Sequence, residues 1–298
     1  MKLVSSTHKA APRWLKDVAN VTTRRYGMLT AGDRPMPDYL IVGAKRAGTT
    51  SLFNYLVRHP GVLQMFPQVR GTKSTDYFFP GSGRSERWYR SHFATERDRR
   101  RRARDLGYRP LSGEASPYYV WDPRIAPAVR AAAPDVRAIL LLREPVRRAW
   151  SHYQERVQNG VEPLSFRDAL DAEEERLSGE RERMAADPEY YSAAFDFHSY
   201  RSRGDYLPQI RNWLEHFPAE QLLVLRAEDL YGDTQATFDE VCKFLRLPRI
   251  EMPTRSSFNA TWRTRDLPPE SEAAELAEWF GPRNAALEEF LGRDLGWG

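Results

Sequence analysis

Residues 39–51, YLIVGAKRAGTTS, combine the residue types and spacing of an anion-binding loop. An apolar stretch leads into a loop bracketed by glycines and then into residues typical of a helix start. Glycines let the backbone approach an anion, and the N–H groups at a helix N-terminus favour negative charge. The interval from Gly43 to Gly48 is that of a loop that binds nucleoside triphosphates, but Thr49 stands where that loop has lysine. The loop carries Lys45 and Arg46 instead. We expect an anion site here; an ordinary strand-to-helix turn capped by threonine is the alternative.

A second strand-to-helix unit spans residues 137–153, RAILLLREPVRRAWSHY. A triphosphatase needs an aspartate at the end of such a strand to hold Mg²⁺, whereas this strand ends in Arg143. Pro145 suits the first turn of the helix that follows, and Ser151 comes about two turns after Arg143. We expect Arg143 and Ser151 to converge at the carboxyl edge of the sheet, where open parallel sheets bind ligands. The alternative is that Arg143 pairs with Glu144 or with a helix carboxylate and that Ser151 is solvated.

Two anion sites without magnesium ligands suggest a nucleotide with two separated phosphates. At these residues the chain resembles sulfotransferases that use 3′-phosphoadenosine 5′-phosphosulfate as donor, since GAKRAGTT (43–50), LREP (142–145) and Ser151 resemble their 5′- and 3′-phosphate motifs. The resemblance runs from about Asp38 to the C-terminus and is closest to bacterial members and to the heparan sulfate N- and O-sulfotransferase branch. Shorter segments that support it lie at residues 88–93, 113–118, 222–230, 280–284 and 292–297.

The resemblance implies a set of donor-binding residues. In the family the loop cation is usually lysine, and Arg46 fills that position here. The 3′-phosphate pair corresponds to Arg143 and Ser151, and Arg263, with Arg265 as the second choice, lies in a segment that resembles the loop closing over the donor. No metal is expected, because a sulfuryl group carries less charge than a phosphoryl group. The residues that match the 5′-phosphate site are Arg46, Ala47, Gly48, Thr49, Thr50 and Ser51.

The general base is where the sequence departs from the family. Heparan-type relatives have a glutamate just before an aromatic pair, and that position holds Ser74 here. Asp76 lies two residues on and could share a side of an extended segment with Ser74. Glu114 is the second candidate base. Relatives with a second lysine have it where this chain has Ala115, and we expect Lys73 to replace that charge. The alternatives are that Asp76 caps a turn and that Glu114 pairs with a buried arginine.

Strands alternating with helices must position these residues, which predicts an α/β fold with a P-loop-type, mainly parallel sheet flanked by helices on both faces. Buried strands are expected near residues 39–43, 136–142 and 221–225, and a short strand or an extended turn at 110–115. Helices are expected at 50–59, 123–133, 145–159, 205–217, 234–245 and 270–291, and one long helix at 165–183. We divide the chain into an N-terminal basic arm, 1–37, and a sulfotransferase domain, 38–298.

Composition narrows the class of protein further. The 298 residues carry a net charge of +4, no run of about 18 apolar residues and no apolar secretory core near the start, so we expect a soluble cytoplasmic protein without a membrane span. The single cysteine, Cys242, excludes an internal disulfide and a cysteine metal cluster and is expected to pack on an apolar helix face. Six arginines fall within residues 97–104, but no aromatic residues interleave with them. We read this run as a solvated face and expect no nucleic acid partner.

The sequence therefore predicts a sulfotransferase that moves a sulfuryl group to a hydroxyl or amine of a small molecule or, as the resembled branch suggests, a saccharide. The alternatives are a nucleotide-binding module without catalytic activity and a P-loop kinase, which would need lysine after Gly48 and a metal carboxylate. The oligomeric state is open. Six aromatic residues could line a sugar cleft or belong to the core: Tyr77, Phe78, Trp88, Tyr118, Tyr119 and Trp121.

Overall fold

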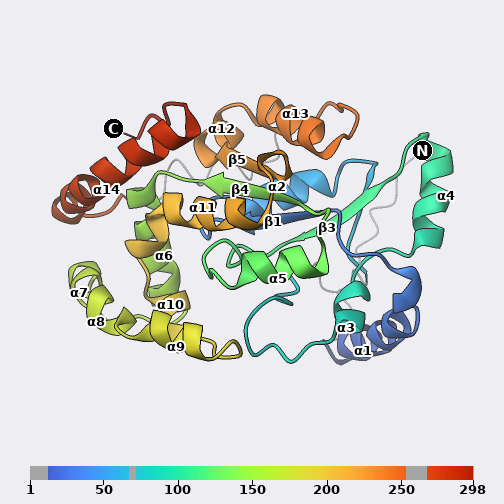
Figure 1. The fold of residues 1–298 in the computed structure, drawn as a ribbon, viewed down its shortest axis with the longest axis horizontal. Helices are drawn as coiled ribbons and strands as arrows, with labels where there is room; N and C mark the ends of the chain where they lie inside the picture. The colour runs from blue at the N-terminus through green and yellow to red at the C-terminus, as the bar shows by residue number, and fades with distance from the viewer. Residues whose placement is uncertain (1–12, 67–71, 253–266, 298) are drawn as a thin grey trace, which may run out of the picture.

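The sheet at the centre of the molecule is parallel throughout the part of the chain that the computed structural model describes, residues 13–66, 72–252 and 267–297 (Figure 1). Its order is β2-β3-β1-β4-β5, so each connection crosses over through helices, as the alternating pattern predicts. The strands are β1 (Tyr39–Gly43), β2 (Val62–Leu63), β3 (Leu111–Ala115), β4 (Arg137–Leu142) and β5 (Leu222–Arg226).

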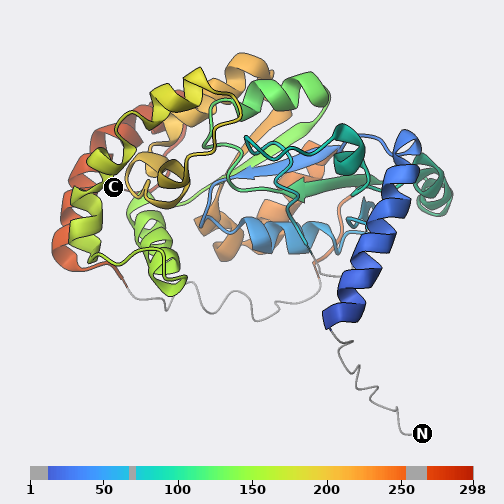
Figure 2. The same ribbon diagram turned by 90° about the horizontal axis from the view of Figure 1, so that it is seen from below.

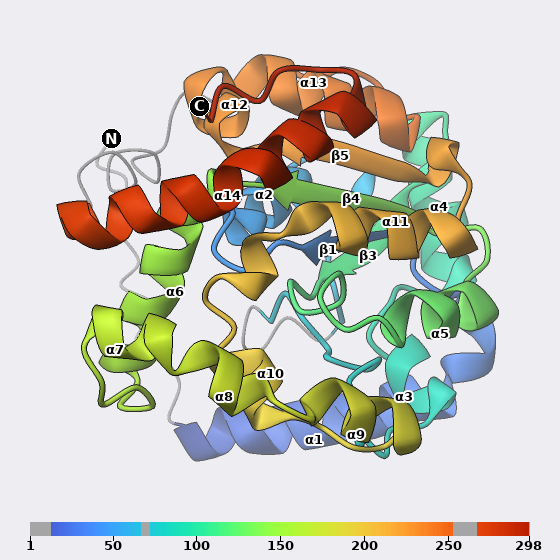
Figure 3. The same ribbon diagram turned by 60° about the vertical axis from the view of Figure 1, so that its left-hand side comes forward.

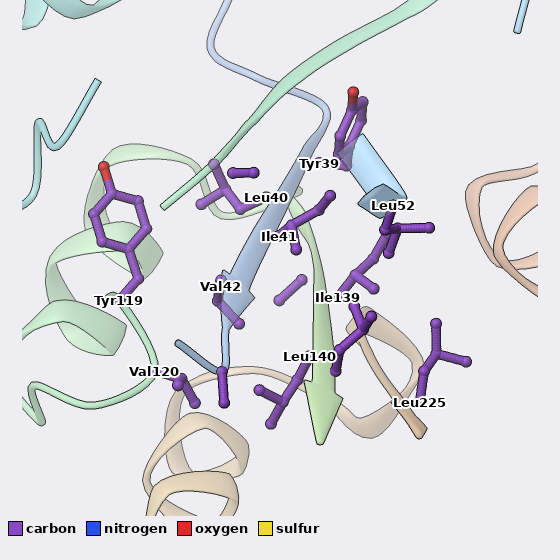
Figure 4. Packing of buried hydrophobic residues seen from close by; sticks show 14 of the residues in the cluster. Tyr39, Leu40, Ile41, Val42, Leu52, Tyr119, Val120, Ile139, Leu140 and Leu225 are labelled. Carbon is purple, nitrogen blue, oxygen red and sulfur yellow. The ribbon is translucent and has the colours of Figure 1, made fainter. Parts of the chain in front are cut away.

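The central strand β1 and its neighbour β4 are short apolar runs, as expected for strands that are covered on both faces. Every residue of β1 is buried. Figure 4 shows Ile41 and Ile139 on the side of Leu52, whereas Leu40 and Val42 point toward Tyr119 and Val120. Tyr39 is in register with Gly113 of β3. A Cβ at Gly113 would lie 2.2 Å from the carbonyl oxygen of Tyr39, so only glycine permits this pairing.

Helices cover both faces of the sheet, as predicted. Figures 1 and 2 show α2, α12 and α13 on one face and α5 and α11 on the other. The segment from α6 to α10 extends beyond the carboxyl ends of the strands (Figure 3). The helices are α1 (Arg13–Leu29), α2 (Thr49–Leu56), α3 (Glu86–Arg90), α4 (Glu96–Leu106), α5 (Ile125–Ala132), α6 (Pro145–Gln158), α7 (Phe166–Asp171), α8 (Glu173–Leu177), α9 (Glu180–Ala186), α10 (Ala193–Phe197), α11 (Tyr206–His216), α12 (Ala227–Gly232), α13 (Thr234–Leu245) and α14 (Glu270–Leu291), with short 3-10 turns at Ala31–Asp33, Ser202–Gly204 and Ala219–Gln221.

One predicted element is wrong. The long helix expected at 165–183 is three short helices, α7, α8 and α9. Gly179 takes a φ of +71°, and the preceding Ser178 is extended, so the chain turns between α8 and α9. At the start of α8 the buried Glu173 carboxylate accepts hydrogen bonds from the backbone N–H groups of Arg201 and Ser202. Helical periodicity alone could show neither this turn nor the contact with a distant segment.

The arginine-rich run forms α4 and is mostly the solvated face that the sequence predicts. Arg99 is the exception, since its side chain is buried and donates to Asp38 Oδ2 and to Ser112 Oγ, both at 2.6 Å. It therefore fixes α4 to the amino edge of the sheet. Cys242 is buried on α13, as expected. Within the described ranges, no helix has the length and apolar character needed to cross a bilayer.

Candidate donor and catalytic site

The loop between β1 and α2 has the geometry of an anion-binding turn. Gly48 takes a φ of +93° just before α2, and a Cβ there would lie 2.6 Å from the hydroxyl oxygen of Tyr231, so glycine is required on two grounds. Among the residues that the structure describes, no side chain caps the N-terminus of α2, although its first residues are Thr49, Thr50 and Ser51. The N–H groups of this first turn therefore have no side-chain acceptor within the described ranges, and a helix N-terminus in that condition suits an anion. The threonine cap considered from the sequence is not formed.

The loop joins the two predicted phosphate sites into one cluster. Arg46 Nε donates to Ser151 Oγ at 3.0 Å, and Arg143 Nη1 donates to the backbone oxygen of Arg46 at 3.0 Å. Burial lowers the pKa of Arg143, and the neighbouring Glu228 partly opposes this effect. A cation held out of water in this way gains from a bound anion. Arg143 and Ser151 thus converge as expected, and Arg46 lies between them.

Two of the alternative roles considered for this second unit are not what the structure shows. Ser151 is buried rather than solvated. Glu144 uses both carboxylate oxygens to cap α6, accepting from the N–H groups of Val146 and Arg147 at 2.8 Å each. The other option, a helix carboxylate near Arg143, is present: Glu228 of α12 is the largest opposing charge on Arg143, and Glu144 contributes less.

Two carboxylates that sequence reasoning missed lie against the loop cations. Glu155 Oε1 is 3.4 Å from Arg46 Nη1, and Asp196 Oδ1 is 3.4 Å from Lys45 Nζ. Burial, with a further contribution from Arg203, lowers the pKa of Lys45 to about 8, while Asp196 opposes the shift. Glu155 lies four residues after Ser151 on the same helix, so helical spacing could have indicated it. Asp196 is far from the loop in sequence and has no comparable signal.

Lys73 approaches the phosphate loop from a separate segment. Its Nζ donates to Thr49 Oγ1 at 3.4 Å, and its backbone oxygen accepts from the N–H of Ala115 at 2.7 Å. Burial lowers the pKa of Lys73, and Asp76 is the main opposing charge. The ammonium group of Lys73 therefore lies at the start of α2. The backbone of Lys73 is paired with Ala115, the position where the resemblance implies a second lysine.

Asp76 is held in a small hydroxyl network at the same edge of the sheet. It takes a φ of +51°, which is unusual for an aspartate. Its Oδ1 accepts hydrogen bonds from Ser74 Oγ and, at 3.3 Å, from Ser116 Oγ. The two serine hydroxyl oxygens are 2.5 Å apart. Ser74, at the position where relatives have glutamate, thus helps to orient Asp76.

Glu114, the other candidate base, is in a very different environment. Its side chain is fully buried at the end of β3, and both oxygens are occupied. Oε2 accepts from the N–H of Thr75 at 2.6 Å, and Oε1 accepts from the hydroxyls of Tyr89 and Tyr119 at 2.9 and 3.0 Å. Burial raises the pKa of Glu114, and these hydrogen bonds oppose the shift. The partners are hydroxyl and amide donors, not the buried arginine considered from the sequence.

Of the remaining predicted site residues, Arg263 and its alternative Arg265 lie outside the described residues.

The six aromatic residues that could line a sugar cleft differ in burial. Tyr118, Tyr119 and Trp121 are buried in the main core, whereas Tyr77, Phe78 and Trp88 are half-buried. The first three cannot line an open cleft in this conformation. Ala47, also predicted at the donor site, is buried in the loop and donates its N–H to the oxygen of Ala44 at 3.1 Å.

The fold and the site together define an α/β protein of P-loop type in which Arg143 follows β4, at the position where a magnesium-dependent enzyme has aspartate. Residues 36–270 match the family model described as a sulfotransferase domain. Because this match covers most of the chain, the protein belongs to the sulfotransferase family, and its class of reaction is sulfuryl transfer. The kinase alternative is not favoured.

Known proteins similar to the chain include heparan sulfate enzymes and a bacterial structure. It is 25% identical over 295 residues to human heparan sulfate glucosamine 3-O-sulfotransferase 6, a match that covers 90% of this chain and 75% of the relative. It is 25% identical over 234 residues to a bifunctional heparan sulfate N-deacetylase/N-sulfotransferase from Caenorhabditis briggsae, covering 78% of this chain and only 25% of that protein. A sulfotransferase from Alicyclobacillus acidocaldarius has a solved structure with a TM-score of 0.61 and 29% identity, covering 88% of this chain and 98% of that one.

Proposed function

We propose that the protein transfers the sulfuryl group of 3′-phosphoadenosine 5′-phosphosulfate to a hydroxyl or amine acceptor. The observation that carries this proposal is the single cluster formed by the uncapped start of α2, Arg46, Ser151 and Arg143. One end of the cluster suits a 5′-phosphate at a helix N-terminus, and the other suits a 3′-phosphate on an arginine and a hydroxyl.

In this proposal the chain's cations stabilise the leaving group. During transfer, a bond forms between the acceptor atom and sulfur while the bond from sulfur to the 5′-phosphate oxygen breaks, so negative charge grows on that oxygen. Arg46 and Lys73 both lie at the loop, and Lys73 contacts Thr49 directly. Positive charge preorganised where the negative charge develops lowers the barrier. Arg263 remains the proposed residue of the loop that closes over the donor.

Asp76 is the proposed general base. A hydroxyl acceptor must lose its proton as the new bond to sulfur forms, and the proton would pass to the Asp76 carboxylate. Asp76 is half-buried and its charge acts on Lys73, so it belongs to the same site as the loop. Glu114 is proposed instead to hold the segment that carries Asp76, because its own oxygens accept hydrogen bonds from four donors.

For the acceptor, we favour a saccharide. The support is the similarity to relatives named as heparan sulfate glucosamine 3-O-sulfotransferases, which covers about nine-tenths of this chain. The half-buried aromatic side chains of Tyr77 and Phe78 flank Asp76 in sequence and offer flat apolar surface of the kind that sugar rings pack against. We also propose a cytoplasmic location, as the composition suggests.

Calorimetry with adenosine 3′,5′-bisphosphate and adenosine 5′-monophosphate tests donor recognition. We expect the bisphosphate to bind at least about tenfold more tightly, since a charge-assisted hydrogen bond contributes roughly 1.5–3 kcal/mol. Arg143→Ala should remove most of this preference. Arg137→Ala is the matched control, because Arg137 lies at the opposite end of β4. Equal affinity for both nucleotides in the wild type would contradict the proposal, as would sulfuryl transfer that Arg143→Ala leaves unchanged.

A further inference from the structure

Helix α1 presents an apolar face to solvent rather than to the core. Seven large apolar side chains are exposed in the described part of the chain, and four of them lie on this one helix. Val18 and Val21 are each 53% exposed and Leu29 is 79% exposed. A helix on the surface of a globular protein normally turns its apolar stripe inward, so this concentration indicates a surface that another body covers. The fourth residue is Tyr26.

The opposite side of α1 makes the contacts with the domain. A Cβ at Gly27 would lie 2.9 Å from the backbone oxygen of Ser91, so α1 approaches α3 closely along this side. Arg24 donates to Ser91 Oγ at 2.8 Å and to the backbone oxygen of Phe66 at 3.0 Å. The helix is therefore fixed by its more polar side, and rotation could not bury the exposed stripe without breaking these contacts.

The spacing of the exposed residues makes the face continuous. At 100° per residue, Val18, Val21 and Leu29 fall within one third of the helix circumference. The sequence extends this spacing toward the N-terminus with Trp14 and Leu15, four and three residues before Val18. A helix of 17 residues is about 26 Å long, and Figure 2 shows its first turns reaching beyond the neighbouring helices.

The charges around this apolar face indicate what kind of surface it binds. Residues 1–29 contain six lysines and arginines and one acidic residue, Asp17. Arg25 is exposed between the apolar positions, and the exposed Arg87 of α3 donates to the backbone oxygen of Met28 at 3.1 Å. A second copy of the chain would bring two such basic faces together, and like charges oppose that pairing. An anionic lipid surface accepts the apolar side chains and the cations together.

We propose that α1 is an interfacial helix that docks the protein on an anionic lipid surface, with Val18, Val21 and Leu29 entering the boundary between head groups and acyl chains and Arg25 meeting the lipid charge. This does not require a membrane span, and it is independent of the proposed transfer reaction.

The test is sedimentation of the full chain with two kinds of vesicle, phosphatidylcholine alone and phosphatidylcholine mixed with phosphatidylglycerol. We expect binding to the anionic vesicles at least about tenfold stronger than to the neutral ones at 0.1 M salt. It should weaken at 1 M salt, where the screening length falls from about 10 Å to about 3 Å. Absence of binding to the anionic vesicles, or equal binding to both kinds, would overturn the proposal.

Variants connect the binding to this face. Val18→Ser combined with Leu29→Ser should weaken vesicle binding about tenfold or more, because the apolar area that enters the lipid is lost. Phe290→Ser is the matched control, since Phe290 is 42% exposed on a different helix, and it should bind as the wild type does. Circular dichroism and binding of adenosine 3′,5′-bisphosphate verify that each variant is folded.

Two results would assign the face differently. Unchanged vesicle binding by the double variant would show that other surfaces carry it. A concentration-dependent dimer in analytical ultracentrifugation that the double variant abolishes, without vesicle binding by the wild type, would assign the face to a second copy. Arg25→Gln should reduce the preference for anionic vesicles several-fold while leaving the weak binding to neutral vesicles unchanged.

Discussion

The two halves of the candidate site are built in opposite ways. The donor half consists of a loop, residues 43–48, and one face of a helix, α6, which each come from a short stretch of sequence. The base half consists of residues 73–76, which form neither helix nor strand and keep their shape through contacts with β3 and with the tyrosines around Glu114. Local conformation determines the first half, and distant partners determine the second.

Each half contains a residue that differs from the one the resemblance implies. In the donor half, Arg46 stands where the resemblance implies lysine, and its guanidinium reaches Ser151 and Glu155. In the base half, Ser74 stands where the resemblance implies glutamate, and its hydroxyl, with that of Ser116, donates to Asp76, the carboxylate that we propose as the base.

The largest effect on rate is expected from a substitution in the base half. For a hydroxyl acceptor, Asp76→Asn should lower the rate of a single turnover by about 10²–10⁴, since the amide cannot take the acceptor's proton. Single-turnover transfer to a defined acceptor measures this, and Asp105→Asn, an exposed residue of α4, is the control. A nearly unchanged rate with a hydroxyl acceptor would show that Asp76 is not the base.

The second largest effect on rate is expected from a substitution in the donor half. Arg46→Ala should lower kcat by about 10²–10³, comparable to the loss of one preorganised oxyanion donor. Binding of adenosine 3′,5′-bisphosphate should fall less, because the charge on the bridging oxygen grows mainly in the transition state. Kinetics and calorimetry on the same preparation separate these effects, with the exposed Arg100→Ala as the control. If affinity and kcat fell equally, Arg46 would be assigned to binding alone.

The smallest effect on rate is expected from the residue that links the base half to the sheet. Glu114→Gln should destabilise the protein by about 1–3 kcal/mol, because an amide group replaces one acceptor oxygen in a buried network. We expect transfer to slow by roughly tenfold or less, with the shape of the pH–rate profile unchanged. Loss of the acidic limb of that profile would instead identify Glu114 as the base.

The difference in stability between the wild type and Glu114→Gln should also depend on pH. Burial raises the pKa of Glu114 in the folded protein above its unfolded value. Protonation of Glu114 therefore stabilises the folded wild type fully below the pKa of Glu114 in the unfolded chain. This contribution to stability is lost as the pH rises through the pKa of Glu114 in the folded protein, whereas glutamine does not titrate. The stability deficit of the variant should be larger at pH 5 than at pH 8, as measured by urea unfolding. A deficit that grows with pH would mean that the carboxylate form is the stabilising one.

Most of the fold and the donor half follow from the sequence because their signals are local. Continuous apolar runs identified three of the five strands, β1, β4 and β5. β3, with the sequence LSGEA, was expected only as a short strand or extended turn, and β2, with only two residues, is too short to show a pattern. The glycine spacing at 43–48 predicted the anion loop, and the helical spacing from Arg143 to Ser151 predicted their convergence. α13 and α14 begin and end at the predicted residues. Periodicity failed at α7 to α9, where the chain turns at Gly179 and where Glu173 contacts residues 201–202.

Only the tertiary structure decided how the base half is arranged and which charges face the loop. Asp76 and Glu114 are both candidate carboxylates in the sequence, and burial behind Tyr89 and Tyr119 gives Glu114 a different environment from that of Asp76. Asp196 reaches Lys45 because the segment after α6 folds back over the loop. The sequence also showed that the N-terminal arm is basic, but not that α1 would be fixed by Arg24 and Gly27 with its apolar side outward. The physical reason is that local patterns determine conformation, whereas burial and charge pairing depend on which distant segments meet.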